Sequence, residues 1–258
     1  MMMIKYWKNG LMSVCLILSG TQALADTVTI RADEWYPFNG VPGSDSPGFM
    51  IEIAARALAK GGHTIDYQIA PWERAVDTVR RGEIDCIVGV HKEEAPDLVY
   101  PKEVQAMDKT AFFAKPGKQW TFDKEHLMTT RLGAISGYSY DGGILDAHIA
   151  ANKGKSLVNT SKGKEALAKN IKMLLAGRLD VIVESQLVME GKLAEMGNTG
   201  KIVEIAKLGE PNELYVACSP AKASSEEYAR LLTDGTRALR DSGELKVILD
   251  KYGLKDWK

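Results

Sequence analysis

Residues 64–90 read TIDYQIAPWERAVDTVRRGEIDCIVGV, and this stretch holds the pattern that decides the fold. A short strand is predicted over Thr64–Ile69. The segment from Trp72 to Gly82 then places apolar residues at i, i+3, i+4 and i+7, which predicts an amphipathic helix that ends at the glycine. The run Ile84–Val90 is almost continuously apolar, as is typical of a strand buried on both faces of a parallel sheet. The stretch therefore predicts a βαβ unit.

Upstream of this unit, the pattern predicts one more strand and helix. Val28 and Ile30 alternate with polar neighbours over Thr27–Ala32, which indicates a strand. A helix is expected over Gly48–Lys60, because its apolar residues recur at helical spacing and two glycines follow it. The segment from Thr27 to Val90 is therefore predicted to alternate strands and helices.

Downstream, the rhythm breaks over His91–Lys109, which is rich in charges and contains two prolines, and we expect a boundary between two lobes there. A second series follows, which predicts a second sheet with helices on its faces. A strand over Thr110–Ala114 precedes the series. The expected strands of the series are Arg131–Ile135, Ser156–Asn159, Asp180–Val183 and Lys201–Ala206, and its expected helices are Gly143–Ala151, Gly163–Ala176 and Gln186–Met196. Another strand, Glu213–Cys218, and a last helical region, Glu226–Tyr252, interrupted at Gly235 and Gly243, are expected after it.

The first 25 residues have the pattern of a secretory signal peptide. Lys5 and Lys8 precede the apolar run Leu11–Leu18, and Ala23-Leu24-Ala25 offers a cleavage site after Ala25. The run is too short to span a bilayer, which needs about 20 apolar residues. We therefore predict a periplasmic protein of 233 residues that begins at Asp26.

Composition narrows the function classes. The mature chain has 31 Lys and Arg against 34 Asp and Glu, with no basic stripe, so a nucleic-acid partner is not expected. It contains no His-Glu-x-x-His, C-x-x-C, phosphate-binding loop or G-x-S-x-G motif, and its four histidines lack the spacing of metal ligands. We expect no cofactor, no metal and no catalytic residue, and a monomer.

Four segments together resemble family 3 of the bacterial solute-binding proteins. They are ADEWYPF at 32–38, GFMIEIA at 48–54, the spacing W-x12-D from Trp72 to Asp85, and the ending GELKVILDKYG at 243–253. The resemblance implies an α/β type II periplasmic-binding fold, with two lobes, each a mostly parallel sheet flanked by helices, and two hinge crossovers. Lobe 1 would comprise 26–104 and 214–258, and lobe 2 with the hinge segments 105–213. The implied function is to capture a small polar ligand between the lobes and deliver it to an ABC-type membrane permease.

This topology would lay the strand Glu213–Cys218 antiparallel beside Ile84–Val90, so that Cys86 and Cys218 could face each other. They would then form a disulfide or remain two buried thiols. We favour the thiols, because directly opposed strand positions seldom give relaxed disulfide geometry.

Ligands of open α/β sheets bind at the carboxyl ends of the strands. In lobe 1, the segments that follow such strand ends are Asp33–Phe38, Trp72–Arg74 and Gly89–Lys92. Aromatic rings there can hold an aliphatic or cationic ligand. Arg74 is the candidate for an anionic ligand group, because a guanidinium pairs with a carboxylate through two hydrogen bonds. The family's amino-acid binders carry a carboxylate-binding arginine after the third strand, whereas this chain has no arginine between Gly82 and Thr130, so Arg74 or Lys92 would replace it. The candidates in lobe 1 are Asp33, Trp35, Tyr36, Phe38, Trp72, Arg74, Gly89 and Lys92.

In lobe 2, the loop Ser136-Gly137-Tyr138-Ser139 resembles the family's loop that holds a ligand carboxylate at a helix N-terminus. Glu184 and Ser185 match the strand end where an acidic residue of the family binds an amino group. Two other functions remain open: a dehydratase-like enzyme with Glu73 and Glu184 as acid and base, and a sensor module for a membrane receptor. The ligand classes left open are amino acids, amines, small peptides, organic acids and opines.

Overall fold

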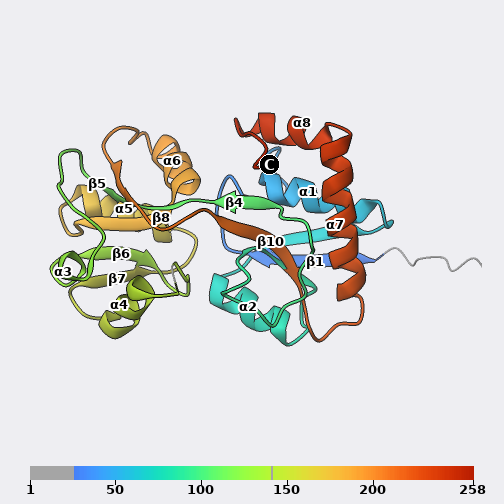
Figure 1. The fold of residues 1–258 in the computed structure, drawn as a ribbon, viewed down its shortest axis with the longest axis horizontal. Coiled ribbons are helices and arrows are strands. Elements are labelled where there is room, and N and C mark those ends of the chain that lie inside the picture. Colours follow the sequence, from blue (N-terminus) through green and yellow to red (C-terminus); the bar gives the residue numbers. More distant parts are fainter. Residues whose placement is uncertain (1–25, 141) are drawn as a thin grey trace, which may run out of the picture.

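The computed structural model describes residues 26–140 and 142–258, so the predicted signal peptide lies outside the described residues. Two five-stranded sheets, each with helices on its faces, form two lobes that lie side by side (Figure 1). None of the helices in these two stretches combines the length and apolar character needed to cross a membrane. The predicted α/β class with two lobes is confirmed.

The first lobe is built on a sheet with the strand order β2-β1-β3-β10-β4. β1 lies parallel to both β2 and β3, whereas β10 is antiparallel to β3 and to β4. The strands are β1 Thr27–Ala32, β2 Thr64–Ile69, β3 Cys86–Val90, β4 Ala106–Asp108 and β10 Asn212–Cys218. Apart from β4, which is too short to show a sequence pattern, these strands match the predictions to within two residues at each end.

Helices cover both faces of this sheet. α1 Phe49–Ala59, α7 Ser225–Asp241 and α8 Glu244–Lys251 lie on one face, and α2 Trp72–Arg80 lies on the other (Figure 1). The predicted break at Gly235 is wrong, because α7 runs through it. A Cβ at that position would come within 2.4 Å of the Cβ of Ala57 in α1, so the glycine allows the two helices to approach closely. The second predicted break, at Gly243, separates α7 from α8.

The second lobe has the strand order β7-β6-β8-β5-β9, in which β5 is antiparallel to β8 and β9. α5 packs on β6, β7 and β8, and α6 packs on β8. The elements are β5 Thr110–Ala114, α3 Lys124–Leu127, β6 Leu132–Ile135, α4 Ile144–Asn152, β7 Val158–Ser161, α5 Ala166–Leu175, β8 Val181–Ser185, α6 Gln186–Glu195 and β9 Val203–Lys207. β7 begins two residues later than predicted, where Val158 pairs with Leu132.

Two connections join the lobes. β4 leads into β5 through Lys109, and the chain returns from β9 to β10 (Figure 1). The first residues of β10 pair with β4, so both connections run side by side. We keep lobe boundaries near 104/105 and 213/214 as a proposal, with β4 and the start of β10 as the hinge segments.

Cys86 and Cys218 form a disulfide, which corrects the expectation of two free thiols. They are opposed in the antiparallel pair of β3 and β10, and their Cα atoms lie 3.9 Å apart. This close approach of the two strands brings the sulfur atoms within bonding reach, which strand order alone did not reveal. The bond therefore ties the hinge strand β10 to the centre of the first sheet.

Candidate functional site

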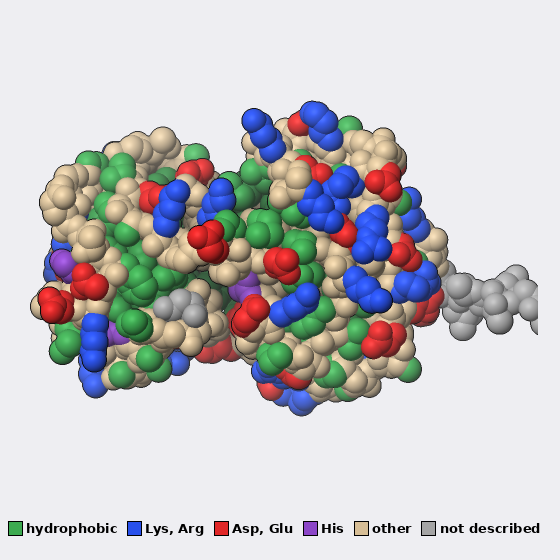
Figure 2. Space-filling model, in the orientation of Figure 1, with side chains coloured by type: hydrophobic (Ala, Val, Ile, Leu, Met, Phe, Trp, Pro, Cys, Tyr) green, Lys and Arg blue, Asp and Glu red, His purple; other side chains and the backbone are tan. Residues whose placement is uncertain are grey.

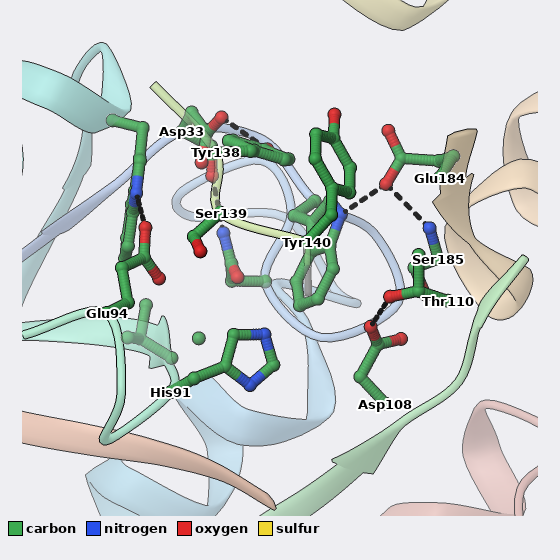
Figure 3. A pocket seen from close by; sticks show the side chains of 15 residues that line it. Asp33, His91, Glu94, Asp108, Thr110, Tyr138, Ser139, Tyr140, Glu184 and Ser185 are labelled. Carbon is green, nitrogen blue, oxygen red and sulfur yellow. Dashed lines mark hydrogen bonds between the residues drawn. The ribbon is translucent and has the colours of Figure 1, made fainter. Parts of the chain in front are cut away.

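A cavity lies between the two lobes, and both contribute to its wall. On the molecular surface, hydrophobic side chains with acidic neighbours gather along the junction of the lobes (Figure 2). In the cavity itself, aromatic and acidic side chains face one another (Figure 3).

The loop after β1 supplies one part of the first-lobe wall. Trp35 is fixed by two backbone hydrogen bonds with Asn39 and by stacking on Phe38, with ring centroids 4.4 Å apart. Gly89 near the end of β3 adopts φ +84°, a conformation that favours glycine, and packs beside the ring of Trp35. This part of the wall is therefore held by the core of the first lobe.

Trp72 and Glu94 form the opposite end of the first-lobe wall. Trp72 is the first residue of α2, with 7% of its surface exposed, and its indole Nε1 donates to Glu94 Oε1 at 2.6 Å. Burial raises the pKa of Glu94 to about 7, although this hydrogen bond opposes the shift.

The loop after β6 forms the second-lobe wall with Tyr138, Ser139 and Tyr140. The carboxylate of Asp146 in α4 accepts hydrogen bonds from the Ser139 hydroxyl and from the backbone N–H groups of Tyr140 and Gly142, at 2.7–3.1 Å. The Tyr140 hydroxyl accepts from the backbone N–H of Ile135 at 2.8 Å. These donors, in the loop that was expected to hold a ligand carboxylate, are thus occupied by a carboxylate of the chain itself.

Two hydrogen bonds cross the cavity from lobe to lobe. The Tyr138 hydroxyl donates to Asp33 Oδ2 at 2.6 Å, and the Trp35 indole donates to Glu184 Oε1 at 2.9 Å (Figure 3). Burial raises the pKa of Asp33 to about 6 and that of Glu184 to about 8, with both hydrogen bonds opposing the shift. Each lobe therefore contributes one aromatic donor and one carboxyl group, which is half-buried for Asp33 and buried for Glu184.

At the rim, the lobes are joined by weaker contacts. The Ser136 hydroxyl donates to Glu73 Oε1 at 3.3 Å, and Lys192 in α6 lies 3.7 Å from a carboxylate oxygen of Glu34. Such partly exposed pairs contribute about 0–1 kcal/mol.

Asp108 and His91 line the cavity beside the hinge. Asp108 Oδ2 accepts from the Thr110 hydroxyl at 3.0 Å, and hydrogen bonding from the buried Ser185 hydroxyl lowers the pKa of the same carboxyl group. Burial raises the pKa of Asp108 and lowers that of His91, so both groups are shifted toward their neutral forms.

More than half of the predicted site residues lie together in the cavity wall, and these span both lobes. They are Asp33, Trp35, Trp72, Gly89, Tyr138, Ser139, Glu184 and Ser185. Their assignment to a ligand remains a proposal.

The other six predicted residues lie outside the cavity wall. Phe38 is fully buried in the core, whereas Tyr36 is 40% exposed. Arg74 is exposed on α2, and Lys92 is exposed with its Nζ 4.4 Å from the ring centroid of Tyr215. Ser136 and Gly137 contact Glu73 at the rim. Glu73 is itself exposed outside the wall, so the acid–base pair of the enzyme alternative is not brought together.

Sequence reasoning missed seven wall residues, most of them adjacent to predicted ones. His91 and Glu94 follow Gly89 in the loop after β3, and Tyr140 ends the loop that carries Tyr138. Asp108 and Thr110 flank the first connection between the lobes. The sequence signal for Asp108 was a charged residue in the predicted boundary between the lobes. The full set is Asn39, Val88, His91, Glu94, Asp108, Thr110 and Tyr140.

The carboxyl groups of the wall do not converge on one point. Glu94 and Asp33 lie on one side of the cavity, and Glu184 and Asp108 lie on the other (Figure 3). Within residues 26–140 and 142–258, no three His, Cys, Asp or Glu side chains are placed to hold a metal ion.

No protein-family model matches this sequence, and no curated protein matches it. Solved structures do match its fold. The chain is similar to a histidine kinase sensor domain described as resembling periplasmic binding proteins, at 18% identity, covering 88% of this chain and 95% of that one with a TM-score of 0.69.

Two amino-acid-binding proteins match as well. The arginine-, lysine-, histidine-binding protein ArtJ from Geobacillus stearothermophilus is 15% identical, covering 90% of this chain and 97% of that one with a TM-score of 0.70. The ABC transporter substrate-binding protein AbpA from Streptococcus pneumoniae, bound to L-arginine, is 16% identical, covering 91% and 98% with a TM-score of 0.68. These matches establish the two-lobed periplasmic-binding-protein fold for nearly the whole described chain.

Proposed function

We propose that this protein binds a small polar solute between its two lobes and presents the closed form to an ABC-type permease. The observation that carries the proposal is the shared cavity, in which Trp35 reaches Glu184 and Tyr138 reaches Asp33 across the gap. A ligand that contacts both walls stabilises the closed form by its greater affinity for that form. A membrane partner can then distinguish closed from open protein.

Periplasmic localisation, with a signal peptide cleaved after Ala25, is part of the same proposal. The similar structures AbpA and ArtJ are described as binding proteins for amino acids, and AbpA belongs to an ABC transporter. A binding protein that serves such a permease works outside the cytoplasmic membrane, which agrees with the N-terminal sequence pattern. We propose that it acts as a monomer and binds without turnover.

A second candidate is a sensor that reports the solute to a membrane receptor. It is favoured by the similarity to the histidine kinase sensor domain, which has the same two lobes. Both functions require the same closing motion. Co-purification with a permease supports transport, and co-purification with a receptor kinase supports sensing.

The test of solute binding uses the mature chain purified from the periplasm. Native mass spectrometry identifies a co-purified small molecule, and thermal shift then screens cationic, zwitterionic and anionic solutes. We expect at least one solute to raise the melting temperature and to reduce the radius of gyration in X-ray scattering. If no solute of any charge class does so, the proposal fails, and steady conversion of a solute to product would favour an enzyme.

A pair of variants in α2 locates the site. Trp72→Phe keeps an apolar wall but removes the indole donor to Glu94, and we expect it to weaken binding by more than about tenfold, or 1.4 kcal/mol. Arg74→Ala, on the exposed side of the same helix, serves as the control and should bind as tightly as wild type. Equal affinities of all three proteins would place the site elsewhere.

A further inference from the structure

The cavity wall is lined by acidic groups without a basic side chain to balance them among the described residues. Four carboxyl groups line it, from Asp33, Glu94, Asp108 and Glu184. Among the described residues, no lysine or arginine lines it, and burial favours the neutral form of His91. Asp108 and Glu184 are buried, and Asp33 and Glu94 are half-buried. Ionised carboxylates in such places are costly without a cationic partner, so a ligand that supplies positive charge would be strongly preferred.

Two hydroxyl groups approach the buried carboxyl group of Asp108 at the hinge end of the wall. Asp108 is 2% exposed, and its Oδ2 accepts from the Thr110 hydroxyl. The Ser185 hydroxyl, on strand β8 of the second lobe, lowers the pKa of the same carboxyl group by hydrogen bonding, against the larger effect of burial. A carboxyl group with two oxygens has acceptor capacity beyond these two donors, so this end of the cavity offers an acceptor to a ligand N–H group.

Aromatic rings stand beside the carboxyl groups. Trp72 is bonded to Glu94 and Trp35 to Glu184, so each indole ring lies next to an acidic group. The ring of Tyr138 meets both indoles edge to face, with centroids 6.4 Å apart in each case. An ammonium or guanidinium group is attracted both to a carboxylate and to an aromatic face.

Within the described residues, a carboxylate of the chain occupies donors of the loop that was expected to hold a ligand carboxylate. The donors that would serve one, at Ser139, Tyr140 and Gly142, are bonded to Asp146. Arg74 and Lys92, which the sequence offered as anion partners, are exposed outside the wall. A carboxylate in this cavity would lie among four acidic side chains without a cation.

The acidic groups lie at two ends of the cavity, with Glu94 and Asp33 on one side and Asp108 and Glu184 on the other (Figure 3). Resting on the proposed solute-binding function, we propose that the ligand is an organic dication without a carboxylate, a diamine or guanidino-amine. One cationic end pairs with Glu94 and Asp33, and the other donates to Asp108 and Glu184. The apolar middle of the molecule lies against the aromatic rings.

Matched pairs of compounds that differ by one carboxylate test this directly. Isothermal titration calorimetry compares agmatine with L-arginine, cadaverine with L-lysine and putrescine with L-ornithine. We expect the member without the carboxylate to bind at least about tenfold more tightly in one or more pairs. Putrescine is also compared with 1-butylamine, and the diamine should bind more tightly by a similar factor if both ends are recognised.

Each contrary result overturns a defined part. If the amino acids bind as tightly as the matching amines, the ligand is not required to lack a carboxylate. If putrescine and 1-butylamine bind with equal affinity, the cavity does not recognise a second cationic end. If the cavity binds only neutral or anionic solutes, the proposal of a dicationic ligand is wrong but the proposed solute-binding function stands. If no solute binds, both proposals are wrong. Calcium or magnesium chloride that produces the same thermal shift as the amines would show a metal site instead.

Two neighbouring glutamates provide matched variants. Glu94 lines the cavity, whereas Glu93 is exposed beside it. We expect Glu94→Gln to weaken binding of the tightest amine by at least about tenfold and Glu93→Gln to leave it unchanged. Asp108→Asn tests the other end with the same expected loss. Circular dichroism confirms that the variants are folded, and unchanged affinity in both cavity variants overturns the proposal.

Discussion

The two lobes build their halves of the cavity in different ways. In the first lobe, Trp35 and Trp72 project from core-packed segments, and a disulfide joins β3 to β10 in the same sheet. In the described part of the second lobe there is no cysteine, and the wall is the loop after β6, shaped by hydrogen bonds to Asp146. The first half-site is thus fixed by packing, and the second by a polar network that a single side chain organises.

The disulfide offers the largest test of this difference. The bond closes a loop with a sequence separation of 132, which contains the whole second sheet, although the bond itself lies in the first lobe. We expect the double variant Cys86→Ala/Cys218→Ala to lose about 2–5 kcal/mol in the free energy of unfolding, measured with urea, because the unfolded chain gains freedom.

Hydrogen exchange of individual strands shows whether the disulfide stabilises mainly the first lobe or both lobes. Hydrogen exchange should show faster opening of β3 and β10 than of β6 and β8. Uniform loss of protection in both sheets would mean that the disulfide does not distinguish the lobes.

The two tyrosines of the second-lobe loop form a sharper comparison, because they differ in what their hydroxyls bind. Tyr140→Phe leaves the buried backbone N–H of Ile135 without an acceptor, and we expect a loss of about 1–3 kcal/mol in the free energy of unfolding. Tyr138→Phe removes a bond to Asp33 in the other lobe, so it should alter ligand affinity and leave unfolding within about 0.5 kcal/mol of wild type. Equal losses of stability would show that both hydroxyls serve the lobe itself.

The pH dependence of binding tests the acidic groups that both lobes contribute. Burial raises the pKa of Asp33 to about 6, of Glu94 to about 7 and of Glu184 to about 8, and Asp108 and Tyr140 face Glu184. Raised carboxyl pKa values stabilise the unliganded protein below about pH 4, and this contribution is lost as the pH rises through these values. A dication prefers the ionised forms, so its affinity should increase by about tenfold to a hundredfold between pH 6 and pH 8.

Calorimetry in buffers of different ionisation enthalpy would detect the accompanying release of protons. The amine itself stays protonated in this range, since an alkylammonium pKa is about 10. An affinity that falls or stays constant between these pH values would contradict the assignment of the carboxyl groups.

The sequence predicted the first lobe better than the hinge. Periodicity located α1 and α2, because helices of 11 and 9 residues repeat their apolar pattern more than once. β1 was found from its alternating residues and β3 from its continuous apolar run. β4 and α3 were missed, since three or four residues carry no period. The break at Gly235 failed for another reason: the glycine serves contact with α1, which only the packed structure reveals.

For the site, the sequence indicated the loops but not which way their side chains point. Trp35 and Phe38 lie three residues apart in one loop, yet one lines the cavity and the other lies in the core. Arg74 was favoured for its chemistry, but the helical turn directs it to solvent while Trp72 faces inward. Glu94 lies in the segment after the third strand, where the resemblance implies a cation, so the sequence did not predict an acidic wall residue there.

The smallest predicted effect is a change in ligand affinity caused by the close approach of the two lobes. Two glycines of the second lobe allow this effect to be measured separately from backbone strain. Gly137 and Gly163 have nearly the same φ, +84° and +85°, so alanine strains the backbone equally at both. Only at Gly137 would the new Cβ meet the first lobe, 2.3 Å from Glu73 Cγ, whereas nothing lies within 4 Å at Gly163. Gly137→Ala should therefore weaken ligand affinity several-fold relative to Gly163→Ala, by less than about 1 kcal/mol because the exposed Glu73 side chain can move aside. Adding Glu73→Ala to Gly137→Ala should restore the affinity, and a failure to restore it would show that the two lobes do not meet at this point in the liganded protein.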